Sequence, residues 1–228
     1  MDTSRQIARR LLEVGAVKLQ PNAPFTWASG LRSPIYCDNR VLLSYPTIRS
    51  EVVDALGGAV PILAGLAHAS QGGSTSGKGR SVDGIAGVAT AGIPHGALLA
   101  DRLQLPFVYI RSSAKEHGRR NQIEGRLEPG KRYLVVEDLI STGGSSLKAI
   151  EALRAAGGQA AGVVAIFTYG FPSAERAFER AEVLLHTLSR YDVLLEEARA
   201  MGTLSDEEAA TLSNWREDPR AWSENFSG

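Results

Sequence analysis

The stretch YLVVEDLISTGGSSLK, residues 133–148, decides the fold. Its apolar, β-branched run at 134–136 is typical of a buried parallel strand. Two acids follow, Glu137 and Asp138, and then a loop of small residues at 141–145. A helical pattern begins at the end of this loop and runs to a pair of glycines that would stop a helix. The stretch therefore predicts a strand, a tight turn and a helix.

The predicted turn has the composition of an anion site. A strand–turn–helix connection directs backbone N–H groups and the positive helix end to one point, which suits a phosphate. The glycines let the backbone approach an anion, and Ser141, Thr142 and Ser145 supply hydroxyl donors. Glu137 and Asp138 would repel a phosphate, so they should face sugar hydroxyls or a divalent cation. From these residues alone, a ribose 5-phosphate site and a capped helix beside solvated acids are about equally supported.

The segment VVEDLISTGGSS resembles the motif with which type I phosphoribosyltransferases bind 5-phosphoribosyl 1-diphosphate (PRPP). It has the hydrophobic strand, the acid pair and the T-G-G-S loop of that motif. The resemblance implies an α/β fold, a type I phosphoribosyltransferase-like parallel sheet flanked by helices, with a small N-terminal hood. It also implies that PRPP is bound by Glu137, Asp138, Leu139, Ile140, Ser141, Thr142, Gly143, Gly144 and Ser145.

A second motif, PFTWASGLRSPIYCDNR, lies at residues 24–40. Alone, it is more simply interpreted as a hairpin that packs its aromatic residues into a core. It is similar to the hood of orotate phosphoribosyltransferases, whose pattern is F-T-x-x-S-G-x-x-S-P-I-Y. The resemblance implies that orotate is the base and that PRPP and orotate yield orotidine 5′-phosphate and pyrophosphate in UMP biosynthesis. The residues expected to bind orotate are Ser141, Lys18 and Phe25, with Arg32 as a further candidate for its carboxylate.

Residues 111–125, RSSAKEHGRRNQIEG, are highly charged and almost devoid of apolar side chains. Alone, they predict a solvated loop that a polyanion would order. Their pattern R-x-x-x-K-x-H-G resembles the catalytic loop of the same family, at the matching place in the chain. By that resemblance Arg111, Lys115 and His117 bind the pyrophosphate of PRPP in the neighbouring subunit of a homodimer. Lys115, His117 and Asp138 are then the expected catalytic residues.

A further strand-to-helix turn is predicted at 89–92, after a strand at 82–88 and before a helix that Pro94 opens. In the family, this turn receives the pyrophosphate of PRPP, often through a cis peptide. The resemblance also implies Mg²⁺ as the cofactor. The ion would be carried by PRPP, and Asp138 is the one candidate protein ligand.

The alternation of helices and strands predicts a core over residues 41–228 behind a hood over 1–40. A Gly/Ser-rich insertion is expected near 67–81; its partial P-loop match at 72–78 lacks the magnesium-binding hydroxyl and is interpreted as accidental. Other expected helices are at 4–14, 47–56, from Pro61, 173–181, 190–200 and after Ser205, and other expected strands are at 107–111, 160–169 and 183–189. We expect Thr3 or Ser4 to cap the first helix and Ser205 with Glu208 to form a capping box at the last. Trp215 and Trp222 are expected to serve packing.

Composition narrows the class of protein. The 228 residues carry 25 basic and 25 acidic side chains, so there is no electrostatic footprint for nucleic acid. The single cysteine, Cys37, allows no internal disulfide. With no signal peptide and no long apolar run, we expect a cytoplasmic protein without a membrane partner. Two alternatives remain at this point: a phosphoribosyltransferase for another base, and a non-enzymatic RNA-binding regulator on the same fold.

Overall fold

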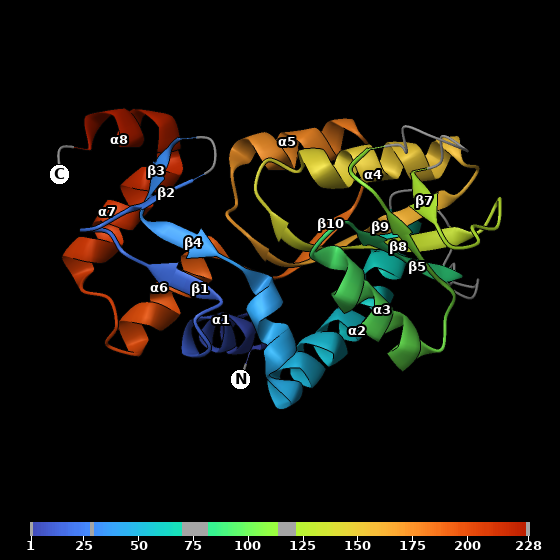
Figure 1. The fold of residues 1–228 in the computed structure, drawn as a ribbon, viewed down its shortest axis with the longest axis horizontal. Helices are drawn as coiled ribbons and strands as arrows, with labels where there is room; N and C mark the ends of the chain where they lie inside the picture. The colour runs from blue at the N-terminus through green and yellow to red at the C-terminus, as the bar shows by residue number, and fades with distance from the viewer. Residues whose placement is uncertain (1, 28–29, 70–81, 114–121, 227–228) are drawn as a thin grey trace. The chain divides into compact units, whose positions relative to one another are not determined.

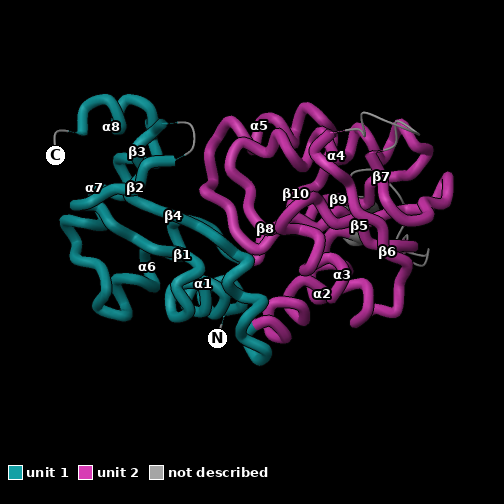
Figure 2. Tube along the Cα trace, viewed as in Figure 1, with its two compact units in different colours: residues 1–48, 189–228 teal, residues 49–188 magenta. Residues whose placement is uncertain are grey.

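The computed structural model describes residues 2–27, 30–69, 82–113 and 122–226 (Figure 1). The chain divides into two compact units (Figure 2). The first contains residues 1–48 and 189–228, and the second contains residues 49–188. The expected hood, residues 1–40, falls inside the first unit. The C-terminal residues join it there, a grouping that the sequence did not indicate.

The second unit is built on a six-stranded sheet with the strand order β10-β9-β8-β5-β6-β7. Strands β9, β8, β5 and β6 pair in parallel, whereas β7 runs antiparallel to β6. The expected α/β parallel sheet is confirmed, and the short strand β7 lies inside the segment expected to be a charged loop. The strands are β5 (Gly84–Val88), β6 (Phe107–Ile110), β7 (Ile123–Glu124), β8 (Arg132–Ile140), β9 (Gln159–Thr168) and β10 (Leu185–Arg190).

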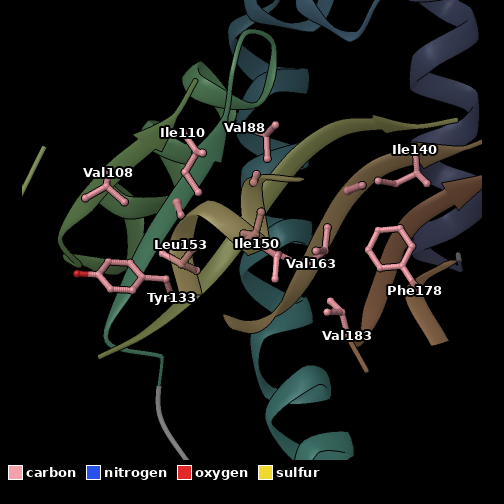
Figure 3. Close-up of a cluster of buried hydrophobic side chains, with 14 of the residues drawn as sticks. Val88, Val108, Ile110, Tyr133, Ile140, Ile150, Leu153, Val163, Phe178 and Val183 are labelled. Carbon is pink, nitrogen blue, oxygen red and sulfur yellow. The ribbon is translucent and has the colours of Figure 1, made fainter. Parts of the chain in front are cut away.

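Helices cover both faces of this sheet (Figure 1). They are α2 (Pro46–Ala69), α3 (Gly92–Leu103), α4 (Gly144–Ala155) and α5 (Pro172–Arg180). The side chains of Tyr133 and Val135 on β8 belong to a buried cluster with Ile150 and Leu153 of α4 and Phe178 of α5 (Figure 3). The whole run at 133–136 is buried, as expected for a parallel strand covered on both faces.

Helix α2 corrects one expectation. Two helices were predicted, one at 47–56 and a short one from Pro61, but the chain forms a single helix with Pro61 inside it. Proline removes one backbone hydrogen bond and usually ends a helix. Here the buried apolar positions continue at helical spacing on both sides of the proline, at Leu56, Ala59 and Leu63. Packing of that face accounts for the continuity of the helix.

The first unit contains short strands and helices, as expected for the punctuated N-terminal segment. Strand β1 pairs with β4 and β2 with β3, both antiparallel. Trp215 is fully buried, with its ring near those of Trp27 (5.8 Å) and Tyr191 (5.7 Å), so its expected packing role is confirmed. The elements are α1 (Thr3–Glu13), β1 (Val17–Leu19), β2 (Phe25–Thr26), β3 (Arg32–Ser33), β4 (Ile35–Cys37), a 3-10 helix (Asn39–Ser44), α6 (Tyr191–Ala200), α7 (Asp206–Glu217) and α8 (Pro219–Asn225).

Local capping agrees with the sequence at one helix and differs at another. Ser205 and Glu208 form the expected capping box at the start of α7. Helix α1 was expected to be capped by Thr3 or Ser4, but its N-cap is Asp2, whose carboxylate accepts from the Ser4 N–H. Within the described ranges, none of the helices combines the length and apolar character that crossing a membrane requires.

Candidate functional site at the carboxyl edge of the sheet

Two strand-to-helix turns lie side by side at one edge of the sheet. The β8–α4 turn is residues 141–143, and the β5–α3 turn is residues 89–91. Strands β5 and β8 are neighbours and parallel, with Gly87 opposite Val136. Because parallel strands end at the same edge, both turns and both helix N-termini face one place. In open α/β sheets this edge is where ligands bind.

The acid pair belongs to the strand and not to the loop. The sequence placed the loop at 141–145, and β8 does run through the acids to Ile140. The ladder to β9 persists through this extension, with Glu137 opposite Ala165 and Ile140 opposite Thr168. Glu137 and Asp138 are therefore held by backbone hydrogen bonds of the sheet. The turn itself is shorter than the expected 141–145 loop.

Glu137 is buried, with 4% of its surface exposed. One carboxylate oxygen accepts from the hydroxyls of Ser145 and Ser146, at 3.1 Å each, and the other accepts from the Asp138 N–H, also at 3.1 Å. Burial raises the pKa of Glu137 to about 8, and the neighbouring Asp138 carboxylate adds to the rise. Asp138 is half-buried, so it is the more accessible acid of the pair.

The β8–α4 turn exposes polar groups at the start of a helix. Gly143 is the N-cap of α4, has φ +80°, and supplies no side-chain cap. Thr142, Gly144 and Ser145 are exposed around it. The positive end of α4 is therefore offered to an acceptor from outside the helix, which is the geometry of an anion site.

The β5–α3 turn approaches β8 closely. Its Ala89–Thr90 peptide is cis, as the family resemblance implied. A Cβ added to Gly92 would lie 2.5 Å from the Val136 carbonyl oxygen and 3.3 Å from the Glu137 Cα. Only glycine fits where α3 begins, because the helix start rests directly on the backbone that carries the acid pair.

Arg111 follows β6 and is half-buried, with Nη1 3.8 Å from Glu124 Oε1. Lys115 and His117 lie outside the described residues, as does most of the Gly/Ser-rich segment near 67–81. Lys18 is exposed on β1 of the first unit.

Phe25 and Arg32 also lie in the first unit and are engaged in local packing. The ring of Phe25 lies 5.6 Å from that of Tyr36. Arg32 donates to the Phe226 carbonyl oxygen at 2.9 Å, and its guanidinium lies over the Phe226 ring. Ser141, the third residue expected to bind orotate, lies in the second unit at the start of the β8–α4 turn.

Sequence reasoning missed two buried hydroxyl residues at this edge, Ser146 and Thr168. Ser146 was part of the quoted stretch but was given no role, because an ordinary helix pattern does not distinguish it. Thr168 is 28 positions from its partner Ile140, so its contact follows from the pairing of β8 with β9 and not from a local motif.

Among the described residues, no three His, Cys, Asp or Glu side chains gather into a group able to hold a metal ion by themselves. The half-exposed carboxylate of Asp138, beside the β8–α4 turn, suits a cation that brings most of its oxygen ligands with it. Magnesium bound to phosphate oxygens is such a cation, because it uses one or two protein carboxylates.

Comparison with known proteins agrees with this geometry. Residues 53–183 match the model of the phosphoribosyl transferase domain. Orotate phosphoribosyltransferase from Bacteroides fragilis is 53% identical over 218 residues, which cover 96% of each chain. The enzyme of that name from Listeria innocua is 47% identical over 97% of this chain and 99% of its own.

A solved structure supports the same assignment. The crystal structure of orotate phosphoribosyltransferase from Aeropyrum pernix superposes with a TM-score of 0.70 at 31% identity, covering 85% of this chain and 98% of that one. The edge of the sheet described above is therefore the edge of a phosphoribosyltransferase domain. The chain belongs to the phosphoribosyltransferase family and, within it, to the orotate phosphoribosyltransferases.

Proposed function

We propose that the chain transfers the 5-phosphoribosyl group of PRPP to orotate, giving orotidine 5′-phosphate and pyrophosphate in UMP biosynthesis. One observation carries this proposal. An acid pair and a glycine turn lie together at the end of β8, and the N-terminus of a second helix follows the neighbouring strand β5. Two adjacent helix starts suit the two phosphate-bearing ends of PRPP, and the acids between them suit its sugar.

The 5-phosphate is assigned to the β8–α4 turn and the first turn of α4. Support comes from the exposed hydroxyls of Thr142 and Ser145, the half-buried Ser141, and the glycines at 143 and 144. Leu139 and Ile140, the last two residues of β8, are assigned to the same phosphate site. The ribose hydroxyls are assigned to the acid pair, with Asp138 the more accessible member.

Transfer breaks the bond between the anomeric carbon of the ribose and pyrophosphate, and the bonding electrons leave with the pyrophosphate. A ring nitrogen of orotate then bonds to that carbon and releases its proton to the solvent. Positive charge develops on the ribose as the old bond stretches, and the carboxylate of Asp138 favours that charge. Asp138 is therefore a catalytic candidate as well as a binding one.

The leaving pyrophosphate is assigned to the β5–α3 turn together with Arg111, Lys115 and His117. The assignment of Lys115 and His117 rests on the family's loop pattern, in which the loop acts in the neighbouring subunit. We accordingly propose a homodimer that shares the 111–125 loop across its interface.

Magnesium would be carried by PRPP, with Asp138 as the candidate protein ligand. When bound, the ion would neutralise negative charge on the pyrophosphate. Lys18, Phe25 and Ser141 are proposed to bind orotate. A cytoplasmic location is proposed for a chain whose one cysteine needs no oxidising compartment.

The test is an assay with orotate, PRPP and magnesium that follows the absorbance of orotate. We expect turnover with orotate and none with uracil, hypoxanthine or adenine in its place. Turnover of one of the control bases would identify a phosphoribosyltransferase for another base. Salt-dependent binding of RNA without turnover of any base would instead favour a regulator.

A further inference from the structure

The β8–α4 turn is flanked at each end by a buried hydroxyl. At its start, Ile140 is the last residue of β8, and its carbonyl oxygen accepts two hydrogen bonds. One comes from the Thr168 hydroxyl at 3.2 Å and the other from the Tyr169 N–H at 3.1 Å. The Thr168 oxygen also accepts from the Gly170 N–H at 3.0 Å. Thr168 therefore joins the last residue before the turn to the end of the neighbouring strand.

At the other end of the turn, Ser146 lies in the first turn of α4 and is fully buried. Its hydroxyl donates to the same oxygen of Glu137 that receives the Ser145 hydroxyl. The helix start is thus attached to β8 through a carboxylate that the sheet holds in place. Ser145 is exposed, so of the two serines it is the one that a ligand can reach.

If packing were the only requirement, apolar side chains would suffice at positions 146 and 168. Residues 163–167 of β9 are all apolar and fully buried, as are Ala149 and Ile150 after Ser146. A buried hydroxyl is costly to desolvate and is tolerated where it has partners. Unlike apolar contacts, a hydrogen bond fixes direction as well as distance. Both hydroxyls are directed at β8, one on each side of the exposed turn, so their common effect is to fix where the turn lies.

We propose that Thr168 and Ser146 are positioning residues that hold the β8–α4 turn in register to receive the phosphorylated end of the ribose. Thr168 acts through the Ile140 carbonyl and Ser146 acts through the Glu137 carboxylate. Neither side chain touches the ligand. The inference rests on the proposed function, because it takes the turn to be the place where the 5-phosphate of PRPP binds.

The sharpest test compares two substitutions of Thr168. Thr168→Val keeps the shape and removes the hydroxyl, which leaves the Gly170 N–H unpaired and Ile140 with one donor. We expect the KM for PRPP to rise about tenfold, because part of the cost of the two lost hydrogen bonds falls on the turn that binds PRPP, with the KM for orotate changed less than about twofold. Thr168→Ser keeps the hydroxyl and loses the methyl group, and should stay within about twofold of wild type. A packing role would reverse this order, because valine preserves the packed volume and serine does not.

Ser146→Ala provides the test at the other end of the turn. We expect the KM for PRPP to rise about fivefold, because Ser145 still donates to Glu137. The matched control is Ser189→Ala. Ser189 is also fully buried, but its hydroxyl has no hydrogen-bond partner in the part of the chain that the structure describes. The control should leave both KM values unchanged.

Binding of PRPP with magnesium is measured on the same proteins by titration calorimetry. Wild type that binds PRPP but does not convert orotate would contradict the proposed function and still allow the positioning residues to be judged from affinity. Wild-type PRPP affinity in both Thr168→Val and Ser146→Ala would overturn the inference, as would a larger defect in Thr168→Ser than in Thr168→Val. If thermal unfolding shows that one of these two variants does not fold, the PRPP affinity of the other variant tests the inference.

Discussion

The two turns at the carboxyl edge of the sheet are neighbours, yet they are held in different ways. The β8–α4 turn is held by directional polar contacts, those of Thr168 to Ile140 and of two serines to Glu137. The β5–α3 turn is held by close packing, because Gly92 leaves no room for a Cβ above the Val136 carbonyl. The first arrangement leaves hydroxyls available at the surface, and the second brings bare backbone close to the acid pair. One edge of one sheet thus offers two chemically different receptors for a ligand with two phosphate-bearing ends.

The largest effect on stability is expected from Gly92→Ala. The added Cβ would lie 2.5 Å from the Val136 oxygen, so the start of α3 must move off β8. We expect the free energy of unfolding to fall by about 3 kcal/mol and activity to be lost. Urea unfolding measures the first quantity. The control is Gly58→Ala in α2, where no atom lies within 4 Å and alanine should stabilise the helix by about 0.5–1 kcal/mol. Equal effects of the two changes would show that close packing does not hold the β5–α3 turn.

Lys115→Ala tests the assignment of the leaving pyrophosphate to the charged 111–125 loop. Loss of a cation that neutralises the leaving pyrophosphate removes an interaction that strengthens as charge develops. The kcat should therefore fall about 100-fold, with little change in the KM for PRPP. This is the opposite of the pattern expected for Thr168→Val, which raises KM. Lys148→Ala, an exposed change on α4, serves as the control. A normal kcat in Lys115→Ala would remove this residue from the catalytic assignment.

Gly143→Ala measures how far the β8–α4 turn also depends on glycine. Gly143 has φ +80°, and an added Cβ would lie 2.7 Å from the Phe178 ring. The left-handed conformation alone costs about 1–2 kcal/mol for a side-chain-bearing residue. Gly130 has nearly the same φ, +78°, with nothing within 4 Å, so Gly130→Ala isolates that cost. We expect Gly143→Ala to destabilise the protein by about 1 kcal/mol more than Gly130→Ala in urea unfolding. If the two losses are equal, the contact with Phe178 contributes nothing.

A pH dependence of stability is expected from the buried acid on the β8–α4 side. The folded state raises the pKa of Glu137 from 4.5 to about 8. Below about pH 4.5 the carboxyl is protonated in both the folded and the unfolded chain, so it adds no slope. Between these two pH values only the unfolded chain releases the proton, so the free energy of unfolding falls as pH rises, by at most about 1.4 kcal/mol per pH unit.

Glu137→Gln should remove this slope, and Glu128→Gln, a change at an exposed position, should leave it as in wild type. Urea unfolding at pH 5, 6, 7 and 8 measures the difference between the variants. A wild-type slope that persists in Glu137→Gln would show that the buried acid does not titrate in this range.

The strand, turn and helix of the candidate site were predictable because their signals are local. The apolar run at 134–136, the acid pair and the glycine turn lie within a dozen residues, and each has a composition that a strand end or a helix start requires. The same holds for the turn at 89–92 and for the capping box at Ser205. The start of the turn at residue 141 agrees with the structure, in which β8 ends at Ile140, but only the pairing with β9 shows that the ladder continues through the acids.

Other features depended on partners far away in the sequence. Nothing near Thr168 indicates that its hydroxyl meets Ile140, and nothing near Pro61 indicates that a buried face will carry α2 past it. The burial of Glu137 is of the same kind. Its sequence position left a ligand-facing acid and a solvated acid equally supported and did not indicate burial, whereas the sheet, the start of α4 and the start of α3 enclose it.

The sequence by itself determined the α/β alternation, the two turns and the family, because periodicity, glycine placement and short motifs are properties of adjacent residues. Only the tertiary structure decided which acid of the pair is buried, which hydroxyls hold the β8–α4 turn, and that the C-terminal residues join the N-terminal unit. The physical reason is that burial and hydrogen-bond pairing are set by the elements that surround a residue. Those elements come together only when strands distant in the chain pair and helices pack across them.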